Sequence, residues 1–187
     1  MPAQIESIRY PYTVSYRDVK HPRLEFRTGE LLLVLPHGHD ECRMIEKHRN
    51  WIEQKYRYID EAISTSVTMT LATRSKDEFR KKIGELVQVY AQELGCAPNR
   101  IFVKRMCSKW ASCSKRGNLT INSLAKYLPD NLVEYIIFHE MVHLINPKHD
   151  SQFWKYLNKK FEKTGEIEKT LCSYWFQLQK KPKREMI

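Results

Sequence analysis

The sequence predicts a protein that mixes short β-strands with α-helices, and three observations support this prediction. Short runs of alternating apolar and polar residues are typical of strands with one buried face. Longer runs with apolar residues three and four positions apart are typical of helices. The chain has 187 residues, which is enough to bury one core and short enough for one domain with a small subdomain.

The first part of the chain combines a small β-region with a helix. YTVSY and RLEFR alternate, and LLLVL is followed by proline, so residues 12–35 predict short strands. Residues 40–63 have helical spacing, and the polar stretch 64–75 is interpreted as a linker or an irregular strand. We therefore expect residues 1–75 to form β-strands plus a helix that belong to the same unit as the rest of the chain.

The second part of the chain alternates helices with a predicted hairpin. Gly95 is a natural helix stop, and Arg116-Gly117-Asn118 is a turn signal between two strands. Asp130 follows a proline and is expected to cap a buried, apolar helix through its side chain. The expected elements are a helix over 77–94, a strand over 101–106 and a returning strand over 119–122. Three more helices are expected: one that begins at 130, one that begins at 150 or 151, and one over 166–178.

The composition is that of a soluble globular protein, with 42% hydrophobic and 29% charged residues. No apolar run approaches the ~20 residues that span a bilayer. The first ten residues lack the apolar core of a signal peptide, so we expect a cytoplasmic protein with no membrane partner. Five cysteines without a C-x-x-C pair argue against a disulfide framework and against a cysteine-based zinc site.

A net charge of +10 fits either a solvated surface or an anionic partner, such as a nucleic acid or a phosphorylated ligand. Part of the basic excess lies in residues 180–187, a basic tail that we expect to be disordered. The other local excess is Lys104, Arg105, Lys109, Lys115 and Arg116.

Three of the seven histidines lie in the segment HEMVHLINPKH, residues 139–149. His139 and His143 are four positions apart, which places both side chains on one helix face and within reach of one metal ion. Glu140 is turned about 100° from His139 and can reach a water held by that metal. The motif therefore predicts His139 and His143 as metal ligands and Glu140 as the catalytic general base.

A catalytic zinc site needs a third protein ligand and an open fourth position. LINP, residues 144–147, is expected to end the helix, because Asn146 tolerates left-handed backbone geometry and proline cannot continue a helix. The returning loop then delivers His149 as the third ligand, and Zn²⁺ is the predicted cofactor. The same spacing occurs in metzincins, although Asn146 replaces their glycine and no Met-turn is obvious.

Other residues are weaker candidates for metal ligands. His37 and His39 form an H-x-H pair that a loop explains better. Glu162, Glu166 and Glu168 are acidic alternatives from downstream helices. If no metal were bound, the apolar helix would bury two imidazoles and a carboxylate without obvious partners, which is costly.

Two segments resemble the YgjP-like metallopeptidase family, which is related to the SprT and Spartan zincins. They are RMCSKWASCSKRGNLTINSLAKYLP, residues 105–129, and VEYIIFHEMVHLINPKHDSQFW, residues 133–154. Ala111 replaces a glycine of the family pattern and KHD replaces its Asn-His-Ser run, and neither change removes a ligand. The N-terminal strands and helix also look like the family's N-terminal part. The matching residues are Trp110, Ser112, Cys113, Ser114, Asn122, His139, Glu140, His143, His149, Ser151, Phe153 and Trp154.

The resemblance implies a zincin-like α+β fold, in which a small antiparallel or mixed sheet packs on the HE-x-x-H helix within a catalytic core over residues 76–179. It also implies zinc held by the three histidines of residues 139–149, with Glu140 as base and proton shuttle. Trp110 and Trp154 are interpreted as packing residues. Cys113 is interpreted as a small buried residue, because no separate histidine base is suggested for it.

The leading hypothesis is a zinc metallopeptidase that acts on protein or peptide substrates, with Glu140 as base for a zinc-bound water. An association with DNA extends this hypothesis, because the Spartan relatives cleave proteins attached to DNA. The residue that stabilises the oxyanion is open among four candidates: Arg105, Tyr127, Tyr135 and Tyr156.

Two alternatives remain. Some YgjP-like proteins are described as hydrolases of nucleoside triphosphates, and the basic segment offers charge for a UTP-type substrate, although Mg²⁺ with carboxylates is more usual for that chemistry. The second alternative is a nucleic-acid-binding module with a structural zinc. Such sites usually have four protein ligands, whereas the sequence indicates three. The sequence does not predict an oligomeric state.

Overall fold

The computed structural model describes residues 11–27 and 29–180 and divides into two compact units, Met1–Thr65 and Ser66–Ile187. The basic tail, residues 180–187, was predicted to be disordered, and its residues 181–187 lie outside the described part of the chain. The predicted assignment of residues 1–75 and 76–179 to one family unit stays a prediction.

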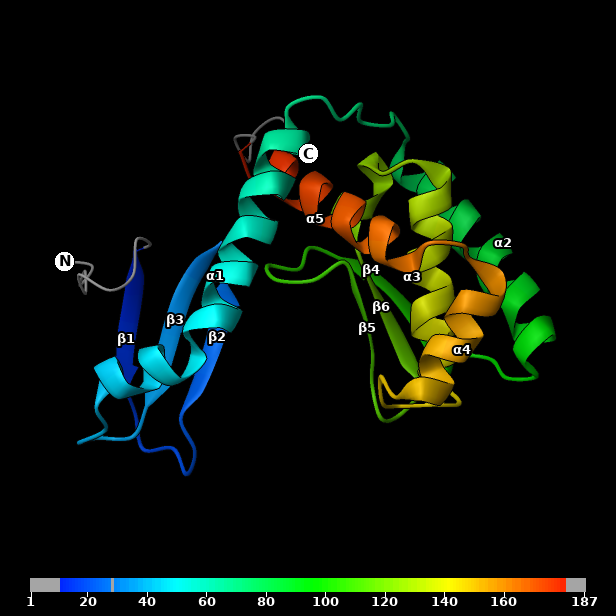
Figure 1. Ribbon diagram of the computed structural model, residues 1–187. Helices are drawn as coiled ribbons and strands as arrows, with labels where there is room; N and C mark the ends of the chain where they lie inside the picture. The colour runs from blue at the N-terminus through cyan, green and yellow to red at the C-terminus, as the bar shows by residue number, and fades with distance from the viewer. Residues whose placement is uncertain (1–10, 28, 181–187) are drawn as a thin grey trace. The chain divides into compact units, whose positions relative to one another are not determined.

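The first unit packs a three-stranded sheet against one helix. Strand β3 is central, with β1 parallel to it on one side and β2 antiparallel on the other. Alternate residues of β3, beginning with Leu31, are fully buried and pack with Ile52 and Tyr56 of the helix α1. Figure 1 shows the first half of α1 lying across this sheet. The elements are β1 Tyr12–Tyr16, β2 Arg23–Arg27, β3 Glu30–Leu35 and α1 Glu41–Ser66.

The second unit contains another mixed three-stranded sheet. Strand β6 is central, with β4 parallel to it and β5 antiparallel, so β5 lies at an edge of the sheet. The hairpin predicted around Arg116-Gly117-Asn118 is present as β5 and β6. A short 3-10 helix, which the sequence analysis did not predict, follows β6. The elements are β4 Arg100–Lys104, β5 Ala111–Cys113, β6 Asn118–Asn122 and η1 Ser123–Tyr127.

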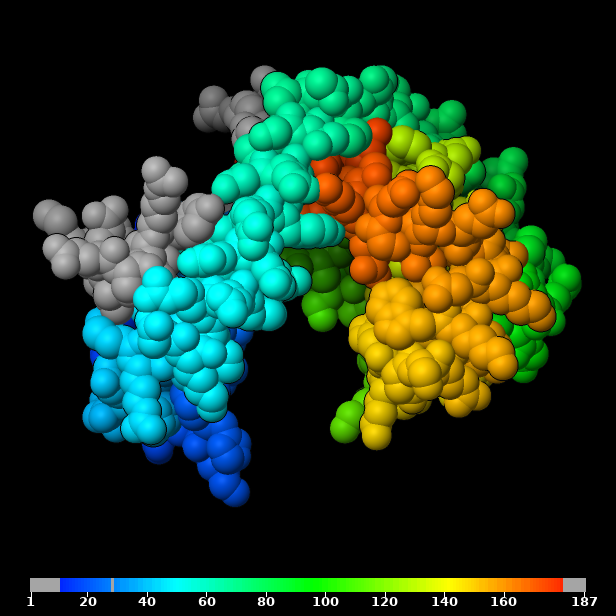
Figure 2. Space-filling view, viewed as in Figure 1, coloured from blue at the N-terminus to red at the C-terminus, as the bar shows by residue number. Residues whose placement is uncertain are grey.

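Helix α3 is the central element of the second unit. Nine of its residues are buried, and it packs against α2, α4, β5 and β6. In Figure 2 the side chains of α4 and α5 leave little of α3 visible on that face. The predicted α+β class, with a small mixed sheet against the HE-x-x-H helix, is confirmed. The helices are α2 Lys76–Leu94, α3 Asp130–Val142, α4 Ser151–Lys160 and α5 Thr164–Lys180.

Helix α2 begins and ends through local side-chain and backbone chemistry. The Ser75 hydroxyl accepts a hydrogen bond from the Glu78 backbone N–H, and the Glu78 carboxylate accepts one from the Ser75 N–H. This reciprocal pair satisfies two donors that a helix start leaves free. At the other end Gly95 has φ +67, the left-handed geometry that glycine adopts at little cost. The predicted stop at Gly95 is confirmed.

The predicted capping role of Asp130 is wrong. Pro129 occupies the cap position of α3, and no side chain caps this end of the helix. Asp130 lies one residue further on, and its carboxylate pairs with Arg74 and, at 2.7 Å, with Lys82 of α2. The charge pairs tie α2 to the start of α3, and Asp130 still places negative charge where a helix N-terminus favours it.

Within the described residues, no helix combines the length and the apolar character that crossing a membrane requires.

Candidate metal centre

The imidazoles of His139, His143 and His149 converge at the end of α3. The Nε2 atom of His149 lies 3.0 Å from Nε2 of His139 and 3.1 Å from Nε2 of His143. The ligand atoms of the three residues all lie within 4.8 Å of one another. Tetrahedral zinc with bonds of ~2.0–2.1 Å separates its nitrogen ligands by roughly 3.3 Å. The three rings therefore present their nitrogens to one point at a spacing close to that of zinc ligands.

The loop after α3 fixes the ring of His143. Helix α3 ends at Val142, and His143 keeps helical backbone angles at the C-cap. Nδ1 of His143 lies 3.1 Å from the Asn146 carbonyl oxygen. A carbonyl can only accept, so Nδ1 carries the proton and Nε2 keeps its lone pair. This is the orienting contact that metal-binding histidines usually have.

Asn146 shapes the loop in a different way from the one predicted. The helix ends here as predicted, but Asn146 does not adopt the left-handed geometry that asparagine tolerates, since Lys163 is the one non-glycine residue with positive φ among the described residues. Instead, the Asn146 N–H donates to the Val142 carbonyl at 2.8 Å, and its side chain accepts from the Lys148 N–H at 3.1 Å. The side-chain amide also donates to Asp150 at 2.8 Å. This nearly buried asparagine therefore braces the turn that carries His149.

Asp150 and Phe153 hold the other side of this loop. The Asp150 carboxylate caps α4 by accepting hydrogen bonds from the backbone N–H groups of Gln152 and Phe153. The ring of Phe153 is fully buried. Its centroid lies 4.6–4.9 Å from those of His139, His143 and His149. One aromatic ring thus supports all three imidazoles.

Burial keeps the first two histidines neutral. It lowers the pKa of His139 to about 3, and the neighbouring His143 and His149 act in the same direction. Burial also lowers the pKa of His143, against the opposing hydrogen bond to the Asn146 carbonyl. Neutral imidazole is the form that binds a metal.

Glu140 lies beside this cluster on α3 and is 8% exposed. Burial raises the pKa of its carboxyl to about 7, while a hydrogen bond from the backbone of Cys113 and the charge of Lys109 oppose the shift. A carboxyl with a pKa near neutrality can both take up and release a proton under physiological conditions.

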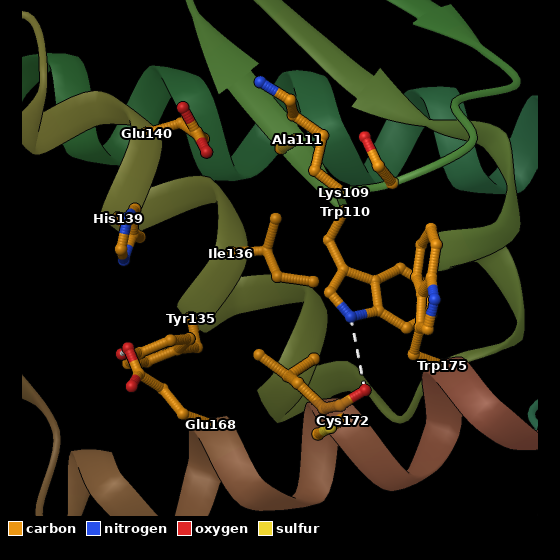
Figure 3. Close-up of a pocket in the computed structure, with 12 residues that line it drawn as sticks. Lys109, Trp110, Ala111, Tyr135, Ile136, His139, Glu140, Glu168, Cys172 and Trp175 are labelled. Atoms are coloured by element: carbon orange, nitrogen blue, oxygen red, sulfur yellow. Dashed lines mark hydrogen bonds between the residues drawn. The ribbon is translucent and has the colours of Figure 1, made fainter. Parts of the chain in front are cut away.

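A cavity of about 360 Å³ opens next to His139 and Glu140. Helix α3 forms one wall, the segment from Ser108 to Ala111 forms a second, and α5 forms the third. In Figure 3 the two site residues lie at one end of this pocket, with Trp110 and Trp175 at the other. The pocket can therefore hold a substrate group beside the three imidazoles.

Comparison with known proteins identifies the family. The family model of the YgjP-like metallopeptidase domain matches residues 64–174, more than half of the chain. The chain belongs to the YgjP-like metallopeptidase family. Membership supports a metal-dependent peptidase whose substrates are peptides or proteins. The likeness of the segment before residue 64 to the family's N-terminal part stays a prediction.

Two solved structures are similar to this family member. One is the metallopeptidase zymogen jannalysin of Methanocaldococcus jannaschii, at 29% identity, covering 48% of this chain and 92% of that chain with a TM-score of 0.43. The other is the metallopeptidase zymogen abylysin of Pyrococcus abyssi, at 25% identity, covering 48% and 90% with a TM-score of 0.44. No curated protein matches the chain.

Asn122, one of the family residues, has a role that sequence reasoning did not assign. It is fully buried. Its amide donates to the carbonyls of Met106 and Lys109, at 2.9 and 2.8 Å, and its oxygen accepts from the N–H groups of Met106 and Leu124. Three of these bonds pin the segment before β5 that forms a wall of the pocket, and the bond from Leu124 caps η1. An asparagine at the end of a largely apolar strand is the sequence signal that could have indicated such a role.

The structure separates the remaining candidates. His37 and His39 are exposed and lie outside the metal-binding group. Glu168 accepts a hydrogen bond from the Tyr135 hydroxyl at 3.1 Å and is likewise outside that group. Of the four oxyanion candidates, Tyr135 lines the pocket, whereas Arg105, Tyr127 and Tyr156 do not.

The three residues interpreted as structural differ in what they do. Trp154 packs against the core, as predicted. Trp110 also packs there, and in addition it lines the pocket. Cys113 is half-buried, and burial raises the pKa of its thiol, which disfavours the nucleophilic thiolate.

Proposed function

We propose that the chain is a zinc-dependent peptidase in which His139, His143 and His149 hold the metal and Glu140 is the general base. One observation carries the proposal: three imidazole nitrogens converge beside a buried carboxylate at the end of a pocket. The family makes a metal-dependent peptidase the expected class.

The donor set fits zinc. Imidazole nitrogens suit zinc, copper, iron and nickel, and three histidines with an open fourth position are a known set for catalytic zinc. Among the described residues, the group contains no fourth histidine, cysteine or carboxylate, which favours a catalytic over a structural site. When bound, zinc supplies a Lewis acid that lowers the pKa of a water to about 7.

Glu140 performs the proton transfers. Its carboxylate accepts a proton from the attacking water and returns it to the amine that leaves, which requires a pKa close to the working pH. Burial places that pKa at about 7. The hydrogen bond from the backbone of Cys113 holds the carboxylate in place during both steps.

Edge strand β5 offers a place for the substrate backbone. The Asn122 N–H donates to the Trp110 carbonyl, and the Ser114 N–H donates to the Asn118 carbonyl. The backbone groups of successive residues in a strand point to opposite sides. The N–H and C=O of Ala111 therefore point away from β6, to the outer edge of β5, which no other strand of this sheet pairs. An extended peptide can pair there with its scissile bond next to the pocket.

Substitution of Glu140 by glutamine tests the mechanism. We expect the zinc-loaded variant to keep its metal, measured by elemental analysis, and to lose about 10²–10⁴-fold in kcat/KM on an unfolded protein substrate. Glu162→Gln, at an exposed carboxylate outside the pocket, is the matched control. Full activity of the Glu140 variant would refute the role of this residue as base.

The charge of the pocket favours a peptide over a nucleoside triphosphate. Of the basic residues in the local excess at 104–116, Lys109 alone lines the pocket, where Glu140 and Glu168 add two carboxylates. Apart from the charge of a bound metal, a triphosphate would meet more negative than positive side-chain charge there. Phosphate release from UTP that disappears in Glu140→Gln would nevertheless restore that alternative.

We also propose an anionic partner, with DNA as the candidate, for a separate cavity of about 270 Å³ in the second unit. Four basic residues from α2, β4 and η1 line it without an acidic one, although Arg80 pairs with the exposed Asp77. We expect single-stranded DNA to bind with strong salt dependence and Lys104→Glu to weaken binding, with Lys155→Glu on α4 as control. Salt-insensitive binding would count against this partner. The basic residues are Lys76, Arg80, Lys104 and Lys126.

A further inference from the structure

The pocket beside the metal centre has an apolar end built from two tryptophans. Their rings meet edge to face, with the centroids of Trp110 and Trp175 5.1 Å apart. The Trp110 indole N–H donates to the Leu171 carbonyl at 3.3 Å, so this donor is already used. Ile136 and Leu171 complete this apolar lining. This end offers hydrophobic and π surfaces to a substrate side chain.

Glu168 brings a carboxylate into the same pocket. It lies on α5, is half-buried, and accepts a hydrogen bond from the Tyr135 hydroxyl at 3.1 Å. Among the residues that the structure describes, no lysine or arginine forms an ion pair with Glu168, whereas Glu166 on the same helix pairs with Lys163 at 3.2 Å. An ionised carboxylate accepts up to about four hydrogen bonds, so Glu168 keeps unused capacity that faces the pocket.

The other charges around the pocket leave that of Glu168 uncompensated. Among the described residues, Lys109 is the one basic residue of the pocket lining, and its charge acts on Glu140. Tyr135 stands between Glu168 and the imidazoles, since its ring lies 6.0 Å from that of His139 and its hydroxyl contacts Glu168. A cation bound at Glu168 is therefore separated from the metal position by a buried aromatic ring.

We propose that this pocket is a substrate subsite that binds a cationic group, with Glu168 as the specificity-determining residue. The carboxylate receives the ammonium or guanidinium, and the apolar end of the pocket offers its surface to the rest of the substrate group. The same ammonium chemistry is offered by a lysine side chain and by a free peptide N-terminus. The subsite rests on the proposed peptidase function, because it assumes a peptide in the pocket.

Binding measured without cleavage is the first test. Peptides that differ at one position, lysine against norleucine, are titrated into the zinc-loaded full chain carrying Glu140→Gln, and tryptophan fluorescence reports binding near Trp110 and Trp175. We expect lysine to bind at least about tenfold tighter, since a charge-assisted hydrogen bond is among the stronger polar contacts. Adding Glu168→Gln, which retains an acceptor for Tyr135, is expected to reduce that ratio to about twofold or less.

Two further variants sharpen the binding test. Glu166→Gln removes an exposed carboxylate of the same helix outside the pocket and is expected to keep the preference for lysine. Glu168→Lys is expected to transfer the preference to a peptide with glutamate at the tested position. Equal binding of the lysine and norleucine peptides to the chain with Glu168 intact would overturn the subsite.

Cleavage by the unmodified chain separates the two ammonium sources and the two proposals. A preference for internal lysine that survives N-terminal acetylation assigns the subsite to a side chain, and a preference lost on acetylation assigns it to the substrate N-terminus. Cleavage without any dependence on Glu168 would refute the subsite and leave the peptidase standing. Glu168-dependent binding without cleavage would refute the proposed reaction and leave the subsite standing.

Discussion

The two sheets of this molecule have the same strand order and different chemistry. In each, the third strand in sequence is central, the first pairs parallel with it, and the second pairs antiparallel with it. In each, helix packing buries alternate residues of the central strand. The shared arrangement therefore does not determine function, which depends on the side chains that follow the third strand.

The segments after the two central strands differ in burial. His37 and His39 follow β3 in an exposed loop before α1, where water can satisfy both rings. His139 lies on α3, an apolar helix with nine buried residues, and Glu140 is among them. Two histidines close in sequence thus become a candidate metal site where burial removes water and a third imidazole returns through a loop.

The largest effect is expected from His143→Ala compared with His39→Ala. Loss of a ligand should lower zinc affinity by more than about 100-fold, since even outer contacts of metal ligands contribute 10–100-fold. The variant in the first unit should bind zinc as the unmodified chain does. Competition with a fluorescent chelator measures both affinities, and equal losses would contradict the assignment of the metal to His143.

The convergence of His139, His143 and His149 was predictable from sequence because its information is local. The four-residue spacing fixes His139 and His143 on one helix face, and Pro147 limits how far the helix can run. Strands β1 and β2 were predictable for the same reason, because alternation reports directly on one buried face. The cap at Asp130 was mispredicted, since Arg74 and Lys82, distant in sequence, compete for its carboxylate.

The next effect is expected from Asn146→Ala. This change removes the side-chain contacts to Lys148 and Asp150 that shape the loop bearing His149, while the carbonyl that orients His143 remains. We expect a loss of about 10–100-fold in zinc affinity. Asn50→Ala, at an exposed position of α1, is the control. An unchanged affinity would mean that the loop holds His149 without this brace.

A smaller effect is expected from Phe153→Leu compared with Tyr56→Phe, two changes that should lower stability alike and differ in zinc affinity. Phe153→Leu leaves space under three imidazoles and should cost about 1–2 kcal/mol together with a loss of zinc affinity. Tyr56→Phe in the first unit removes hydrogen bonds to Pro11 and Leu31 and should cost about 1–2 kcal/mol without affecting zinc. Urea unfolding and chelator competition separate the two variants, and matching zinc losses would contradict the support role of Phe153.

The contacts of Phe153 and Asn122 could not be derived from sequence spacing. Phe153 meets His139 across fourteen positions of chain, and Asn122 reaches back to Met106. Both depend on how α4 and the segment before β5 fold back onto α3 and β6, which periodicity does not encode. The aromatic and amide types were visible in the sequence, but their partners were set by tertiary packing.

The smallest effect is expected from Asp130→Asn. The hydrogen bond from Lys82 and the charge of Arg74 lower the pKa of Asp130, but its side chain is 65% exposed, so the pairs should stabilise the fold by no more than about 1 kcal/mol. A lowered pKa means that this stabilisation is present above the ordinary carboxyl pKa and is lost as the pH falls through the lowered value. The unmodified chain and the variant should therefore differ slightly in urea midpoint at neutral pH and converge in acid. A difference in urea midpoint that grows in acid would contradict the lowered pKa of Asp130. We expect the same zinc affinity for the unmodified chain and the variant, because the ion pairs of Asp130 do not reach the three imidazoles.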